Sequence, residues 1–110
     1  MGEREQMRDN RTVTVLGETY WIWFDDVTET DRYGDCDRYA KEINIYLKTF
    51  DNEDSCKCID KVIDKTVRHE LIHAIFHEAG LDEYAEDETL VDCLAILYPK
   101  IEKIMESVSK

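Results

Sequence analysis

The stretch D-K-V-I-D-K-T-V-R-H-E-L-I-H-A-I-F-H-E-A, residues 60–79, decides the fold of this chain. Its apolar residues recur every three or four positions, which is the spacing of one face of an α-helix and not the alternation of a strand. Gly80 follows directly, and glycine commonly ends a helix because it adopts the left-handed conformation without a steric penalty. The pattern predicts one long helix whose apolar face is formed by Val62, Ile63, Val67, Leu71, Ile72, Ile75 and Phe76.

Residues 69–73 of this helix spell H-E-L-I-H, which is an H-E-x-x-H motif. Helical residues four apart are neighbours on one face, so His69 and His73 can both reach a single zinc ion. Glu70 is offset by roughly 100° around the helix and can take a proton from a water bound to the same ion. The motif predicts a zinc-dependent hydrolase in which Glu70 is the catalytic base.

A catalytic zinc site normally needs a third protein ligand. His77 lies too far along the helix to share one ion with the histidine pair, so we expect it at the rim of the site. Glu88 lies early in a second predicted helix that must fold back on the first, and we expect it to be the third ligand. Asp92, one turn later, is expected to accept the outer N–H of a ligand histidine. The alternative ligands are Glu83, Glu86 and Asp87.

Three strands are predicted before the long helix. Residues 12–16 and 19–24 are rich in β-branched and aromatic side chains, and the Gly17-Glu18 turn between them indicates a hairpin. Residues 42–47 alternate between apolar and polar side chains, which predicts a half-buried strand. Residues 25–38 are polar and acidic and contain Gly34, so we expect a loop there.

Two further helices are predicted after the long one. Residues 86–98 are patterned as a helix, Pro99 interrupts it, and residues 100–108 form a short C-terminal helix. The predicted class is α+β: about three antiparallel strands, a long active-site helix, a ligand-bearing second helix and the short last helix. We expect residues 1–11 to form a flexible arm and residues 12–110 to form a single domain.

Charge and composition narrow the classes of partner. The chain has 26 acidic and 14 basic residues, a formal net charge of −12, which disfavours general binding to nucleic acid. It contains no apolar run of membrane-spanning length and begins with a polar segment, so we expect a cytoplasmic protein with no membrane contact. A reducing compartment disfavours disulfides, so free thiols are expected, with Cys93 packed in a helix. The four cysteines are Cys36, Cys56, Cys58 and Cys93.

The run H-E-L-I-H at residues 69–73, followed by E-T-L-V-D at residues 88–92, resembles the glutamate-zincin metallopeptidases. The wider phrasing, R-H-E-L-I-H-A-I-F-H-E-A-G-L and D-E-T-L-V-D-C-L-A-I, resembles short zinc-peptidase-like proteins of bacteriophages and prophages, distantly of the ImmA/IrrE type. The resemblance implies a minimal zincin-like domain in a bacterial or phage-infected cell. It also implies zinc ligands His69, His73 and Glu88, a catalytic base Glu70 and an orienting acid Asp92.

The resulting hypothesis is a metallopeptidase acting on a peptide or protein substrate. A peptide would add to residues 42–47 as an extra strand, and His77 or Tyr84 would stabilise the charge that develops on the carbonyl oxygen. The alternatives are a zinc-binding phage or mobile-element protein that modulates a host protein without turnover, a zinc hydrolase with another substrate, and a helix that binds no metal. Trp21 and Trp23 should face away from Tyr20 and Ile22, and a set left exposed would be a homodimer or partner surface.

Overall fold

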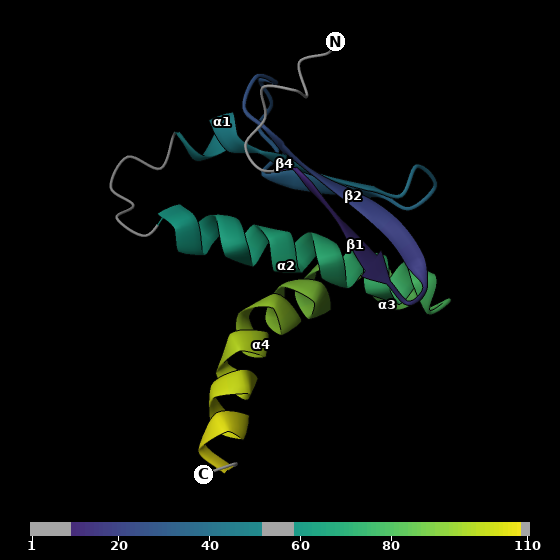
Figure 1. Cartoon of the computed structure of the whole chain (residues 1–110), viewed down its shortest axis with the longest axis vertical. Helices are drawn as coiled ribbons and strands as arrows, with labels where there is room; N and C mark the ends of the chain where they lie inside the picture. The colour runs from purple at the N-terminus through teal and green to yellow at the C-terminus, as the bar shows by residue number, and fades with distance from the viewer. Residues whose placement is uncertain (1–9, 52–58, 109–110) are drawn as a thin grey trace.

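The computed structural model describes residues 10–51 and 59–108, and these form a mixed α+β structure (Figure 1). A four-stranded sheet lies against one side of a long helix, and a second long helix extends away from both. The strands are β1 (Arg11–Val15), β2 (Glu18–Asp25), β3 (Gly34–Asp37) and β4 (Glu42–Tyr46). The helices are α1 (Leu47–Phe50), α2 (Ile59–Glu78), α3 (Asp82–Ala85) and α4 (Glu88–Val108).

The strands run in the order β1-β2-β4-β3, which differs from the predicted three antiparallel strands. The expected β1–β2 hairpin is confirmed, and Leu16 and Gly17 at its turn both have positive φ, as a tight type I′ connection requires. β4, however, pairs parallel to β2, because the chain passes first to the outer edge as β3 and then returns between them. Strand β4 is therefore internal, and β3 is the edge strand beside α2.

Strand β3 lies within the segment that was predicted to be a loop, and polar contacts explain why it pairs. Asp35 stands opposite Asn44 and accepts a hydrogen bond from its amide at 3.0 Å and another from the Tyr46 hydroxyl at 2.6 Å. Gly34 permits the close approach of α2. A Cβ at Gly34 would lie 2.9 Å from the carbonyl oxygen of Asn44 and 3.3 Å from Cγ of Glu70.

The core lies between the sheet and α2. Tyr20, Ile22 and Phe24 of β2 point toward the helix together with Ile43 and Ile45 of β4. The predicted opposite orientation of Trp21 and Trp23 is confirmed, because their rings stack at 4.9 Å on the other face of the sheet and Trp21 is exposed. The bounds at the start of the chain also shift, since Arg11 belongs to β1 and not to the arm, while residues 1–9 lie outside the described residues.

Helix α4 is continuous through Pro99, which corrects the prediction of a break followed by a separate short helix. Proline has no N–H to donate to the carbonyl four residues earlier, here that of Ala95. The side chain of Arg68 on α2 donates from Nε to that carbonyl oxygen at 2.8 Å. The missing backbone hydrogen bond is thus replaced by one from a neighbouring helix. Helix α4 begins at Glu88, where Asp87 accepts the backbone N–H of Leu90 as an N-cap.

Candidate metal centre

The face of α2 that meets the sheet also carries the acidic residue of the H-E-x-x-H motif. Ile63, Glu70 and Ala74 are the fully buried residues of α2, and their spacing of seven and four places them on one face. A carboxyl therefore occupies a core position where an apolar side chain would be ordinary. His69 and His73 lie one step around the helix, partly buried and turned toward the start of α4.

The two imidazoles and Glu88 converge on one point. The Nε2 atoms of His69 and His73 lie 3.2 Å apart. The Glu88 carboxylate places Oε1 2.9 Å from Nε2 of His69 and Oε2 3.2 Å from Nε2 of His73. A tetrahedral zinc ion with bonds of about 2.0–2.1 Å requires neighbouring ligand atoms roughly 3.3 Å apart, so this triad fits the ion closely. Among residues 10–51 and 59–108, the side chains of His69, His73 and Glu88 form a group that could hold a metal ion.

The outer nitrogens of both histidines also have partners. Nδ1 of His73 lies 2.6 Å from the backbone carbonyl oxygen of Ala85, which can only accept, so this nitrogen donates and Nε2 keeps its lone pair toward the triad. Nδ1 of His69 lies 3.4 Å from Oδ1 of Asp92. Lys65, 3.1 Å from the same oxygen, and His69 itself hold the pKa of Asp92 below its usual range. Asp92 thus lies beside the outer nitrogen of His69, as its expected orienting role would require.

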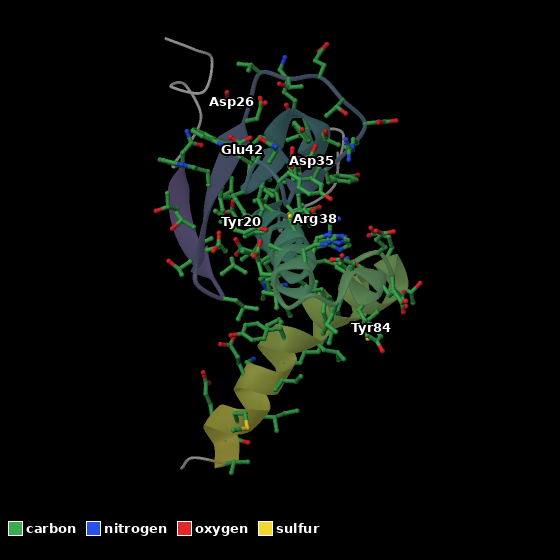
Figure 2. All side chains as sticks on the ribbon, turned by 90° about the vertical axis from the view of Figure 1, so that its right-hand side faces the viewer. Tyr20, Asp26, Asp35, Arg38, Glu42 and Tyr84 are labelled. Atoms are coloured by element: carbon green, nitrogen blue, oxygen red, sulfur yellow. The ribbon has the colours of Figure 1, made fainter. Side chains whose placement is uncertain are left out.

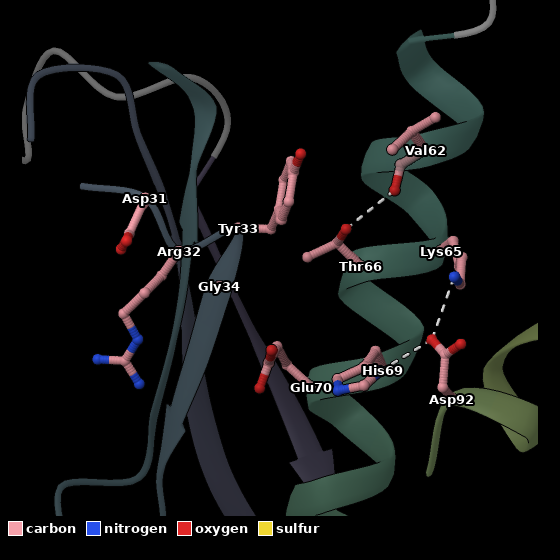
Figure 3. Close-up of a pocket in the computed structure, with 10 residues that line it drawn as sticks. All are labelled: Asp31, Arg32, Tyr33, Gly34, Val62, Lys65, Thr66, His69, Glu70 and Asp92. Carbon is pink, nitrogen blue, oxygen red and sulfur yellow. Dashed lines mark hydrogen bonds and ion pairs between the residues drawn. The ribbon is translucent and has the colours of Figure 1, made fainter. Parts of the chain in front are cut away.

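Glu70 projects from α2 toward the sheet, away from the side on which His69 meets Asp92 (Figure 3). It is only 6% exposed. Burial is the main reason why the pKa of its carboxyl is raised to about 8, and the charges of Asp35 and Glu88 raise it further while Arg32 opposes them. In the metal-free protein Glu70 is accordingly a proton carrier with a pKa near neutrality, the property that acid–base catalysis uses.

Two cavities meet at this carboxyl. The smaller, of about 260 Å³, contains the triad and Glu70 and is closed on its other side by β3 residues, including Asp35 and Cys36. The larger, of about 480 Å³, extends along α2 from His69 and Glu70 and is bordered by the segment that leads into β3 (Figure 3). Arg32 and Gly34 line both cavities. Together they form a groove beside the edge strand, with Glu70 at its middle.

The two predicted charge stabilisers are separated by the structure. His77 lines the smaller cavity, and its Nδ1 lies 3.0 Å from Oδ1 of Asp82 and 3.1 Å from a guanidinium nitrogen of Arg38. Tyr84 is exposed, packs its ring 6.1 Å from that of Phe76, and lines neither cavity. Figure 2 shows Tyr84 well apart from Asp35, which borders the site. His77 is therefore the one placed to act on a bound group.

Sequence reasoning missed the wall of the site opposite α2. Arg32, Asp35 and Cys36 come from a stretch that was predicted to be a loop, and no local motif marks them. Among the alternative third ligands, Asp87 serves as the N-cap of α4, and Glu83 and Glu86 are exposed side chains outside the triad. The backbone carbonyl of Ala85 was also missed, because a main-chain acceptor leaves no signature in the sequence.

The described thiols lie outside the candidate ligand set. Cys36 is half-buried, and burial together with the charges of Glu70 and Asp35 raises the pKa of its thiol to about 12, which keeps it protonated. Cys93 is free, as expected, but it is exposed on α4 and not packed as predicted. Cys56 and Cys58 lie outside the described residues.

No family model, characterised protein or solved structure matches this chain. None of the helices within residues 10–51 and 59–108 combines the length and the apolar character needed to cross a membrane.

Proposed function

We propose that this protein is a zinc-dependent metallopeptidase in which His69, His73 and Glu88 hold the metal and Glu70 is the general base. One observation carries the proposal: two imidazole nitrogens and a carboxylate converge within the span of one ion, beside a buried carboxyl that the core does not need. Three donors with oriented outer nitrogens are typical of a catalytic zinc site, in which a fourth position is left for water or substrate.

When bound, zinc supplies Lewis acidity that polarises a carbonyl group and favours deprotonation of water. Glu70 takes a proton from the attacking water while the oxygen of that water bonds to the peptide carbonyl carbon. The same proton then passes from Glu70 to the amine nitrogen as the C–N bond breaks. Glu70 is buried beside β3 and lines the cavity that contains the triad, which is the position this proton transfer requires. His77, on the wall of the same cavity, is the candidate to stabilise negative charge on the carbonyl oxygen.

The edge strand supports a peptide as the substrate. Because β4 is internal, the expected addition of a peptide to residues 42–47 is wrong, and β3 is the strand whose outer edge adjoins the groove. An extended peptide paired with β3 would place a carbonyl group near Glu70 and a side chain in the 480 Å³ cavity. Backbone pairing of this kind places few demands on the substrate sequence, so the proposed substrate class is an extended peptide or an unfolded protein segment.

The main alternative is a zinc-binding protein that modulates a host protein without turnover. A purely structural zinc site closes its coordination with four protein ligands and needs no buried general base. The metal-binding group found in the described part of the chain has three members, and Glu70 adjoins it. These observations favour the catalytic hypothesis, and the bacterial or phage-infected cytoplasm remains the proposed location for either.

The test compares Glu70→Gln with wild type, using protein purified without a histidine tag. We expect one zinc per chain in both, and a loss of peptide turnover of about 10²–10⁴-fold in Glu70→Gln, the usual worth of a general base. Glu83→Gln is the matched control, since it makes the same change on an exposed residue, and its turnover should equal that of wild type.

Three results would contradict parts of this proposal. Undiminished turnover in Glu70→Gln would remove that residue as the base. Retention of zinc by His73→Ala would show that the metal centre is elsewhere. A wild-type protein that binds zinc at the triad and cleaves nothing in a diverse peptide library would favour the non-catalytic alternative.

A further inference from the structure

An apolar stripe runs along the length of α4. Its residues recur with alternating spacings of four and three, the heptad pattern that helices use to pair with other helices. The exposed fraction rises along the stripe, from 39% at Leu97 to 72% at Val108. We call these residues the α4 stripe: Leu90, Leu94, Leu97, Ile101, Ile104 and Val108.

Only the first half of α4 is packed within the described chain. Val91 and Ala95 are its buried residues, and they face α2, to which Arg68 also ties the helix. Beyond Pro99 the helix extends away from the sheet and from α2 (Figure 1). Every residue from Ile101 to Val108 is exposed. Exposed apolar surface that continues over several turns marks an interaction site more often than a free surface.

The stripe continues into an apolar groove between α2 and α4. The groove has a volume of about 460 Å³, and Leu94 and Ile101 of the stripe form part of its wall together with Tyr98. On the other side it is lined by α2 residues that include Ile72 and Ile75. One chain therefore presents both a projecting apolar helix and an apolar groove that could receive a helix, which is the self-complementarity that a two-fold dimer requires.

The charge distribution favours a second copy of the chain over a basic partner as the occupant. With a net charge of −12, two copies repel each other over most of their surface. Residues 97–108 are the exception, since Lys100 and Lys103 balance Glu102 and Glu106 there. A basic partner would be drawn to the acidic surface and not to this neutral, apolar one. The segments outside the described residues are a poor match for the groove, since residues 1–9 read M-G-E-R-E-Q-M-R-D and residues 52–58 read N-E-D-S-C-K-C.

We propose that two copies of this chain form a two-fold dimer in which the α4 stripes pair and each helix end packs into the groove between α2 and α4 of the other copy. Twelve residues of helix span only about 18 Å, which is short for a free-standing coiled coil. The groove supplies the additional apolar surface that a stable interface needs. This inference does not depend on the metal centre or on catalysis.

The test is sedimentation equilibrium of the full chain at protein concentrations from 1 to several hundred µM. This range of ~two orders of magnitude brackets the dissociation constant of a typical weak dimer. We expect wild type to sediment with twice the mass of one chain at high concentration. The double variant Ile101→Glu/Ile104→Glu should be monomeric, with a dissociation constant raised at least ~100-fold, because it buries unpaired charge at the seam. Ile104→Glu alone, at a side chain 62% exposed in one chain, should weaken the dimer while the far-UV circular dichroism keeps its folded form.

Lys103→Glu is the control, because it adds more negative charge to the same helix but on the face opposite the stripe. It should remain a dimer. A monomeric wild type throughout the range would overturn the proposal, as would a dimer that survives the double variant. Equal dissociation by Lys103→Glu would do the same, since it would show that charge alone governs association.

Discussion

Glu70 is the residue at which a core position of the fold and the proposed chemistry coincide. It occupies the line of core positions on α2, between Ile63 and Ala74, and yet it carries a carboxyl. Local spacing was enough to predict its neighbours His69 and His73 as a pair, because i, i+4 geometry follows from the helix alone. The residues opposite Glu70, such as Asp35 and Arg32, could not be predicted, since they reach the site only through long-range strand pairing.

The raised pKa of Glu70 predicts how the metal-free protein responds to pH. Its carboxyl has a pKa of about 8 in the folded chain and an ordinary value when unfolded, so at pH above the unfolded value only the unfolded state releases the proton. The free energy of unfolding should therefore fall between about pH 4.5 and pH 8 by up to about 1.4 kcal/mol per pH unit. Urea unfolding in EDTA at pH 5.5 and 8.0 measures this.

Glu70→Gln is the variant with which the pH dependence of wild type is compared, because glutamine has nearly the shape of glutamate and does not titrate. At pH 8.0 the variant should have a higher free energy of unfolding than wild type. This difference in free energy between the two proteins should be smaller by ~2 kcal/mol or more at pH 5.5. Identical pH dependence in the two proteins would mean that the folded carboxyl titrates as it does in the unfolded chain.

Among the elements, α4 departs most from its prediction, because proline was given its usual role as a helix breaker. The prediction failed because the hydrogen-bond donor to the Ala95 carbonyl is the Arg68 side chain. Arg68 lies 27 residues earlier in the chain, so the local sequence does not reveal it. Strand β3 was missed for a related reason. Its residues are polar, and what stabilises them is the pairing of Asp35 with Asn44 and Tyr46 across the strands. The helix α2 and the β1–β2 hairpin could be predicted because their signals are local.

The Arg68–Ala95 contact yields a double-mutant prediction. Arg68→Ala should lower the free energy of unfolding by about 1–3 kcal/mol, because it leaves a partly buried carbonyl without its donor. In a Pro99→Ala background the backbone N–H of residue 99 can serve that carbonyl, so the same change should cost about 1 kcal/mol less. Urea unfolding of the four proteins completes the cycle, and strict additivity would show that the two residues act separately.

On the scale of the whole molecule, the candidate metal centre joins the two long helices of the structure. His69 and His73 belong to α2 and Glu88 is the first residue of α4, so a bound ion would fix the angle between them. Zinc at 100 times its dissociation constant should raise the free energy of unfolding by about 2.7 kcal/mol. Thermal unfolding with zinc and with EDTA measures the effect.

Substitutions at the candidate metal centre should reduce the stabilisation by zinc to different extents. His73→Ala should abolish it, and Asp92→Asn should reduce zinc affinity by about 10–100-fold, the usual effect of removing the acid that orients a ligand histidine. Glu102→Gln, an exposed acid far along α4, should respond to zinc as wild type does. Full zinc stabilisation in His73→Ala would be incompatible with the triad.

The contact between His73 and the carbonyl oxygen of Ala85 has a consequence for mutational scanning. Asp92 and its role toward His69 can be erased by changing one codon, whereas a main-chain oxygen survives every amino-acid replacement. Position 85 would register in such a scan only as a demand for a small side chain, since Ala85 is 1% exposed. Of the two groups that contact the outer nitrogens of the histidine pair, the Ala85 carbonyl therefore cannot be removed by an amino-acid substitution. Its contribution can be tested by replacing the peptide bond after residue 85 with an ester in a semisynthetic chain. The ester weakens the Ala85 acceptor and leaves every side chain unchanged, and it also removes the Glu86 N–H that donates to the carbonyl oxygen of Asp82.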